Sequence, residues 1–265
     1  MRWFKLKKIC IFGTDKRSIY LRKLFLVEVD KLVSYKEATD IIAPIPFSRD
    51  SITVTGEIIK IDELIEVLKK NKSKLYAGAI KTEIKRKLDL NGINYVDIMQ
   101  EEELVIKNTI PTAEGAIYTA MGMTDCTLAS VKILILGFGR VGKTLAKMLS
   151  SINSNIYCEA RKETDIAFIE CMGYNKVKLA ELNERLGEFD IVFNTIPTVI
   201  LDVDRLKLLK EDAIVIDLAS APGGIDYNAA KELNVNVNWA LALPAKVAPK
   251  TAAIYVKETL DKLME

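Results

Sequence analysis

A glycine-rich segment, Gly137-Phe138-Gly139-Arg140-Val141-Gly142, constrains the fold of this chain more than any other feature. It follows a run of four apolar residues, Ile133–Leu136, which predicts a buried parallel strand. Apolar residues then recur at helical spacing, so the glycines lie between a strand and a helix. This is the context that the G-x-G-x-x-G fingerprint of dinucleotide-binding proteins requires. It favours a cofactor site over a turn that binds nothing.

The positions of this segment have distinct predicted roles. Gly137 makes the tight turn, Gly139 lets the backbone approach a pyrophosphate, and Gly142 lets the helix pack on the strand. Arg140 and Val141 open the helix, whose N-terminus offers unpaired N–H groups and the positive end of its dipole to phosphates. We therefore expect all five residues to bind the cofactor.

The next predicted strand, residues 155–160, determines which cofactor is expected. Ala160 stands where an acid would bind the ribose 2′-hydroxyl of NAD, and Arg161 and Lys162 follow it. An arginine here accommodates the 2′-phosphate of NADP, because guanidinium–phosphate pairs are charge-assisted and often bidentate. NADP is therefore favoured over NAD, although Glu159 could still reach a ribose hydroxyl.

Two further predicted strands, residues 190–193 and 213–216, end in loops on the cofactor side of the sheet. Open parallel sheets bind ligands at the carboxyl ends of their strands. The sequence Pro222-Gly223-Gly224 is either an ordinary turn or a backbone contact with the nicotinamide end. The residues of these loops that we expect at the cofactor are Asn194, Thr195, Ile196, Pro197, Asp217, Ala219, Ser220, Gly223 and Gly224.

The composition is that of a globular protein. The 265 residues are enough for two domains, with 49% hydrophobic and 28% charged residues. A net charge of +2 gives no argument for a nucleic acid or a membrane as partner. Residues 1–8 are basic, but the apolar run Ile9–Phe12 is too short for the core of a signal peptide.

Two residue types limit the chemistry. The chain has no histidine, so proton transfer must use lysine, a carboxylate, tyrosine, cysteine or water. The cysteines at 10, 126, 158 and 171 form no C-x-x-C pair. We therefore expect no metal site and no disulfide framework, which fits a reducing cytoplasm.

The segment Lys8–Ser18 echoes the glycine segment. A lysine, four apolar residues and Gly13 again precede a helical pattern. Asp15 and Ser18 replace the second and third glycines, and a carboxylate at Asp15 would repel a pyrophosphate. Unless the likeness is a coincidence between two strand–helix starts, it predicts a second α/β unit that does not bind a dinucleotide.

These patterns predict a two-domain α/β protein, with a C-terminal Rossmann domain that binds NAD(P) and a smaller N-terminal domain of flavodoxin-like or Rossmann-like type. Residues 1–107 form the N-terminal, substrate-side domain, 108–128 a linking helix, and 129–243 the NADP-binding domain. Residues 244–265 include a helix that returns to the N-terminal domain. Thr112 is the expected N-cap of the linking helix.

Motifs extend over nearly the whole chain. They are Asn108–Gly115, Leu136–Arg140, Ala160-Arg161, Asn194–Pro197, Asp217–Ser220, Pro222–Gly224 and Val247–Ala252. In this order and spacing they resemble the A subunits of dipicolinate synthase, most strongly from Asn108 onward. Two positions depart from the family pattern: Glu159 replaces an expected glycine, and Leu243–Lys246 replaces leucine, proline, glycine and an apolar residue.

This resemblance implies an NADP-dependent oxidoreductase. Its reaction would oxidise a dihydrodipicolinate from the lysine pathway to dipicolinate (pyridine-2,6-dicarboxylate) for spore formation. The resemblance also implies a separate B subunit of flavoprotein-like fold, a homo- or hetero-oligomer, and a place in the cytoplasm of the mother cell of a sporulating bacterium.

A dicarboxylate substrate needs cations and hydroxyl donors. Ser48 and Arg49 follow a predicted strand, and we expect them with Thr112 on one side of a cleft that has Gly223 and Gly224 on the other. Lys246 is a further candidate cation, more easily explained as a surface residue.

Lys250 follows Pro249 where the closing helix is expected to begin. A cation there opposes the helix dipole, which favours a functional reason for it. We predict that Lys250 binds a substrate carboxylate or takes the ring proton.

Other functions stay open. A 2-hydroxyacid dehydrogenase shares the two-domain plan, but the chain lacks the histidine that acts as its acid. An NADP-dependent oxidoreductase similar to shikimate dehydrogenase uses a lysine and also fits Arg161. A non-catalytic NADP-binding subunit is the third alternative.

Overall fold

The computed structural model describes residues 7–29, 31–153 and 155–265. Most of the basic N-terminal segment, residues 1–8, lies outside the described residues. The chain divides into two compact units. Unit 1 comprises residues 1–108 and 248–265, and unit 2 comprises residues 109–247. Within the described ranges, no helix has the length and apolar character needed to cross a membrane.

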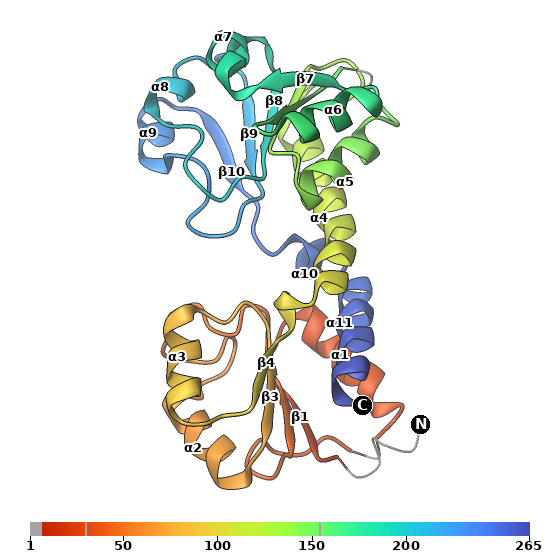
Figure 1. The fold of residues 1–265 in the computed structure, drawn as a ribbon, viewed down its shortest axis with the longest axis vertical. Helices are drawn as coiled ribbons and strands as arrows, with labels where there is room; N and C mark the ends of the chain where they lie inside the picture. Colours follow the sequence, from red (N-terminus) through yellow and green to blue (C-terminus); the bar gives the residue numbers. More distant parts are fainter. Residues whose placement is uncertain (1–6, 30, 154) are drawn as a thin grey trace. The chain divides into compact units, whose positions relative to one another are not determined.

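Unit 1 is a four-stranded parallel sheet with helices on both faces (Figure 1). The strands lie in the order β1-β2-β3-β4, and α2 and α3 cover one face while α1 and α11 cover the other. The elements are β1 (Ile9–Ile11), α1 (Lys16–Leu26), β2 (Asp40–Ile42), α2 (Ile61–Asn71), β3 (Lys74–Ala77), α3 (Thr82–Leu90), β4 (Tyr95–Asp97), a 3₁₀ turn (Ile98–Gln100) and α11 (Pro249–Met264).

Alternation along the strands produces the two layers of unit 1. Ile9 and Ile11 point into a core with α1 and α11, whereas Cys10 points into the core with α2 and α3. Lys257 also joins α11 to the α1 side. Its Nζ lies 2.7 Å from Glu28 Oε2 and 4.7 Å from the centre of the Phe25 ring.

Unit 2 is a six-stranded parallel sheet in the order β10-β9-β8-β5-β6-β7. Numbered within the unit, this is the doubly wound order 3-2-1-4-5-6 read from the other end, and the strand order reverses between β5 and β8. The predicted α/β class and the C-terminal Rossmann domain are therefore confirmed. The strands are β5 (Ile133–Leu136), β6 (Ile156–Ala160), β7 (Asn175–Lys178), β8 (Ile191–Asn194), β9 (Ile214–Asp217) and β10 (Asn236–Trp239).

Helices cover both faces of the second sheet as well (Figure 1). The face with Ile133 and Ile135 packs on α4, α5 and α6, and the face with Leu134 and Leu136 packs on the shorter helices α7, α8 and α9. The helices are α4 (Glu102–Met123), α5 (Arg140–Leu149), α6 (Glu163–Cys171), α7 (Leu182–Arg185), α8 (Val203–Leu206), α9 (Tyr227–Glu232) and α10 (Leu243–Val247), with 3₁₀ turns at Leu179–Glu181 and Leu186–Glu188.

The expected N-cap role of Thr112 is wrong. Helix α4 begins at Glu102, contains Pro111 in its interior, and continues to Met123, so that Thr112 is an interior residue of the helix. A proline inside a helix costs about 3 kcal/mol. Burial of one face of α4 offsets that cost, because Ala113, Ala116 and Ala120 are fully buried at helical spacing.

Strand β7 was not predicted from the sequence. Its only buried residue is Val177, and Asn175 and Lys176 are exposed. It lies at the edge of the sheet, next to β6 alone. An edge strand with one buried side chain carries too little apolar alternation to be recognised.

Candidate functional site

The glycine segment forms the turn between β5 and α5. Gly137 has φ +88°, in the left-handed region that favours glycine, and a Cβ there would lie 2.6 Å from Thr195 Oγ1. A Cβ on Gly142 would lie 2.1 Å from the carbonyl oxygen of Gly137. The chain's own packing therefore requires glycine at both positions.

Gly139 differs from the other two glycines because its surroundings are open. A Cβ placed on it would meet nothing within 4 Å. It is the N-cap of α5, and within the described residues no side chain caps that helix end. An open cradle with N–H groups at the positive end of a helix fits a dinucleotide pyrophosphate. Arg140 and Val141 are the first two residues of this helix.

The loop after β8 is bonded to the end of β5. Both the N–H and the hydroxyl of Thr195 donate to the carbonyl oxygen of Leu136, each at 2.9 Å. The N–H of Ile196 donates to Asn194 Oδ1 at 3.1 Å. This loop therefore lies directly against the glycine turn, with Pro197 exposed after it.

Asp217, at the end of β9, joins the loops after β8 and β9. Its buried carboxylate accepts hydrogen bonds from the Asn194 amide at 2.8 Å, the Ala219 N–H at 2.9 Å, the Gly224 N–H at 2.8 Å and the Tyr227 hydroxyl at 2.6 Å. Burial, and then the carboxylate itself, raise the pKa of the Tyr227 phenol, so this donor stays protonated. Asp217 and Asn194 were predicted to contact the cofactor, but their side chains are fully buried in this network and position the two loops.

Close packing fixes the loop after β9. A Cβ on Gly224 would lie 2.1 Å from Asn194 Nδ2, and Gly223 has φ +88°. The Trp239 indole N–H donates to the carbonyl oxygen of Ala219 at 3.0 Å, and its ring stacks on Tyr227 at 4.9 Å. Ser220 is exposed on this loop. Sequence reasoning missed Tyr227 and Trp239, because no local spacing connects them with Asp217.

Glu159 lies at the carboxyl end of β6, opposite Leu136. It is 1% exposed, and its Oε2 accepts the Gly137 N–H at 3.2 Å, whereas its Oε1 has no hydrogen-bond partner. Burial raises the pKa of this carboxyl, against the bond from Gly137 and the charges of Arg161 and Arg205. The Ala160 side chain is buried beside it, and Arg161 and Lys162 are exposed. A buried carboxylate oxygen without a partner marks this end of the turn as a place for a hydroxyl donor.

The structure changes the role of Ser48. Its side chain is 1% exposed, its hydroxyl donates to Asp50 Oδ1 at 3.1 Å, and the hydroxyl oxygen accepts the Ser51 N–H at 3.0 Å. The expected donation to a substrate is therefore replaced by bonds that shape its own loop. Arg49 is exposed, and its carbonyl oxygen accepts a bond from Lys81 at 2.7 Å.

The predicted cations lie in different units. Lys250 is exposed in the first turn of α11, directly after Pro249 and with no acidic residue in that turn, and belongs to unit 1. Lys246 is exposed on α10 and belongs to unit 2, as does the half-buried Thr112. The cleft predicted between the domains stays a prediction.

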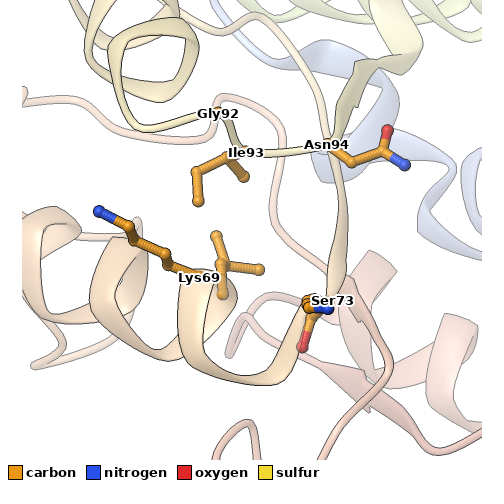
Figure 2. A pocket seen from close by; sticks show the side chains of 7 residues that line it. Lys69, Ser73, Gly92, Ile93 and Asn94 are labelled. Carbon is orange, nitrogen blue, oxygen red and sulfur yellow. The ribbon is translucent and has the colours of Figure 1, made fainter.

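A pocket lies where α2 ends and where β3 and β4 begin (Figure 2). This is the amino end of the unit 1 strands, opposite the edge at which parallel sheets bind ligands. The hydroxyl of Ser73 donates to the carbonyl oxygen of Ala38 at 2.6 Å and is occupied. We assign no function to this pocket. Its lining residues are Leu68, Lys69, Lys72, Ser73, Gly92, Ile93 and Asn94.

Comparison with known proteins identifies the domain and the family that the chain resembles. Residues 109–227 match the family described as D-isomer specific 2-hydroxyacid dehydrogenase, NAD binding domain. The A subunit of dipicolinate synthase from Bacillus subtilis (strain 168) is 29% identical over 97% of this chain and 95% of that protein. Unit 2 is therefore a nicotinamide dinucleotide-binding domain of the dehydrogenase type.

Solved structures agree with this result. The crystal structure of the dipicolinate synthase A subunit from Bacillus halodurans matches with a TM-score of 0.89 and 27% identity, over 99% of both chains. A transhydrogenase from Sinorhizobium meliloti, at 13% identity and a TM-score of 0.72 over 97% of this chain and 93% of that one, shares the fold. The predicted resemblance to the dipicolinate synthase A subunits is confirmed.

Replacing Gly142 by alanine tests the geometry of the turn. We expect Gly142→Ala to lower the free energy of unfolding by about 1–3 kcal/mol, because the new Cβ would overlap the Gly137 carbonyl oxygen. Gly122→Ala is the control, since a Cβ at this position of α4 meets nothing within 4 Å. Urea denaturation measures both variants, and equal stabilities would contradict the close packing of α5 on β5.

Proposed function

We propose that this chain, which resembles the A subunit of dipicolinate synthase along its whole length, oxidises a dihydrodipicolinate to dipicolinate with NADP. The observation that carries the proposal is this whole-chain resemblance, together with the open glycine cradle at the start of α5. The absence of histidine separates the chain from 2-hydroxyacid dehydrogenases, whose domain it shares.

In this proposal, different residues bind the cofactor, bind the substrate and take the proton. The N-terminus of α5 and Gly139 hold the pyrophosphate, Arg161 pairs with the 2′-phosphate, and the loops fixed by Asp217 border the nicotinamide end. When bound, the nicotinamide supplies hydride acceptance. Lys250 binds a substrate carboxylate or takes the ring proton, and Arg49 adds a second cation. Loss of one hydride and one proton converts the dihydropyridine ring to the aromatic product.

The proposed partner is a B subunit of flavoprotein-like fold. The proposed location of the chain is the cytoplasm of the mother cell of a sporulating bacterium. The proposal rests on the resemblance to proteins that are named as an A subunit.

Product formation by the purified chain tests the proposal. The chain is supplied with reduced dipicolinate and NADP, alone and with the B subunit, and dipicolinate is measured by mass spectrometry. We expect dipicolinate and NADPH in equal amounts. Shikimate is the control substrate, since its oxidation would support a shikimate-dehydrogenase-like enzyme. Tight NADP binding without any turnover would support a non-catalytic subunit.

The choice of cofactor should depend on Arg161 and Glu159. We expect Arg161→Ala to weaken NADP binding about tenfold and to leave NAD binding unchanged, because only NADP carries the 2′-phosphate. Glu159→Gly should raise the ratio of NADP to NAD affinity, because it removes a carboxylate that would repel the 2′-phosphate at the expected ribose end. Titration calorimetry with both cofactors measures the affinities, and equal wild-type affinities would contradict the NADP preference.

The NADP preference should also depend on pH. Glu159 is neutral below its raised pKa and charged above it, so repulsion of the 2′-phosphate increases as pH rises through that pKa. The ratio of NADP to NAD affinity should therefore fall with rising pH. Glu159→Gln controls for ionisation of the 2′-phosphate itself, and the same pH dependence in this variant would exclude Glu159 as the cause.

The role of Lys250 is tested by Lys250→Met, which keeps the length of the side chain and removes its charge. We expect little change in folding or NADP affinity. If Lys250 only binds substrate, KM should rise, and if it acts only in the transition state, kcat and kcat/KM should fall together. Lys246→Met is the matched control. Normal turnover by Lys250→Met, with a raised Tm, would show that Lys250 is an unfavourably placed surface charge.

A further inference from the structure

Among the described residues, Arg17 is the only buried arginine, with 8% of its surface exposed. It is the second residue of α1, which follows β1 and the turn at Gly13. The side chain therefore belongs to the carboxyl edge of the unit 1 sheet. This is the edge at which a parallel α/β sheet receives a ligand.

The hydrogen bonding of Arg17 leaves most of its guanidinium unused. Nη2 donates to the carbonyl oxygen of Ile45 at 2.6 Å, and across the described ranges Arg17 forms no ion pair. A guanidinium has five N–H donors, so one bond to a neutral carbonyl satisfies little of it. Burial lowers the pKa of this arginine, and only the nearby charge of Asp15 opposes that effect.

Asp15 does not serve as the missing partner. One of its carboxylate oxygens accepts the Ser18 N–H at 3.1 Å, and the other accepts the Ser18 hydroxyl at 2.8 Å. Asp15 is thus the N-cap residue of α1, and its carboxylate is occupied by the capping bonds. A buried cation is normally paired, because removing it from water without a counter-charge is unfavourable. Arg17 has the burial of a paired arginine but no acid partner among the described residues, and its remaining guanidinium nitrogens reach solvent, since none of them is a buried atom without a hydrogen bond.

The neighbouring turn already has its own carboxylate. Glu57 Oε1 accepts the Gly13 N–H at 2.7 Å. The Glu57 carboxylate therefore occupies the place at this turn where a pyrophosphate would otherwise bind. A Cβ on Gly13 would lie 3.1 Å from Pro44 Cγ, so the loop after β2 is packed against this turn. The loop that carries Glu57 also contains Thr55, whose buried Oγ1 has no hydrogen-bond partner. Two incompletely bonded donors therefore lie on segments packed around one turn.

We propose that Arg17 is a substrate-binding residue, which pairs with one carboxylate of a planar dicarboxylate at the carboxyl edge of unit 1. The proposal rests on the proposed function for the identity of the ligand. The planar guanidinium matches a carboxylate with two parallel hydrogen bonds, which a lysine cannot reproduce.

A structural role for Arg17 predicts a different behaviour. Arg22, on the same helix, donates to the carbonyl oxygens of Ile11 and Gly13 and connects loop and helix. If Arg17 were a similar connection to Ile45, its removal would lower stability and leave ligand affinity unchanged. Arg22→Met is therefore the matched control for loss of bonds to carbonyl groups.

The experiment measures binding of dipicolinate and of pyridine-2-carboxylate to the full chain by titration calorimetry, with NADP affinity and Tm as further readouts. Wild type should bind the dicarboxylate at least tenfold more tightly than the monocarboxylate. Arg17→Met should lose this preference and retain NADP affinity, while Arg22→Met should retain the preference. If Arg17→Met does not fold, Arg17→Lys replaces it, and it should weaken dipicolinate binding without a change in Tm.

The outcomes separate this inference from the proposed function. Unchanged dicarboxylate preference in the Arg17 variants, or no dipicolinate binding by wild type, overturns the inference. Turnover by wild type together with an unchanged KM in Arg17→Met overturns the inference and leaves the proposed function intact. If wild type binds dipicolinate but shows no turnover, and Arg17→Met loses dicarboxylate binding, the subsite is supported and the proposed function is refuted.

Discussion

The carboxylate of Asp217 holds together the part of unit 2 on which a dinucleotide site depends. It accepts four hydrogen bonds, from Asn194, from two main-chain N–H groups of its own loop, and from Tyr227. Asn194 then approaches Gly224 so closely that no side chain fits between them. Because a fully satisfied buried network allows few alternative arrangements, the loops after β8 and β9 are fixed in advance of any ligand.

The two units use the same strand–turn–helix start in different ways. In each, the first glycine donates its N–H to a glutamate side chain, Glu57 at Gly13 and Glu159 at Gly137. The difference lies two residues later. Asp15 caps α1 with its own carboxylate, whereas Gly139 leaves the start of α5 open to a phosphate. One substitution thus determines which helix end is satisfied internally and which can receive an anion.

The two turns have buried ionisable groups of opposite charge next to them. Arg17 is a buried cation with little internal compensation, and Glu159 is a buried carboxylate with one oxygen unpartnered. Neither arrangement favours folding, because Glu159 Oε1 is buried without a hydrogen bond and Arg17 is largely removed from water without an acid partner in the described part of the chain. Glu159 lies at the carboxyl end of β6, and Arg17 lies in the first turn of the helix that follows β1, each on the side of its sheet where parallel α/β proteins bind ligands.

The sequence by itself determined the α/β class, the strands β5 and β6, and the glycine turn, because apolar runs and a fixed glycine spacing are local signals. The tertiary structure decided what local signals cannot carry. Pro111 lies inside α4 because distant burial offsets its local cost, and β7 forms by pairing with β6. Ser48 is occupied within its own loop, and Asp217 meets Tyr227 and Asn194 only when three segments converge. These roles depend on contacts between residues far apart in the chain, which no spacing in the sequence records.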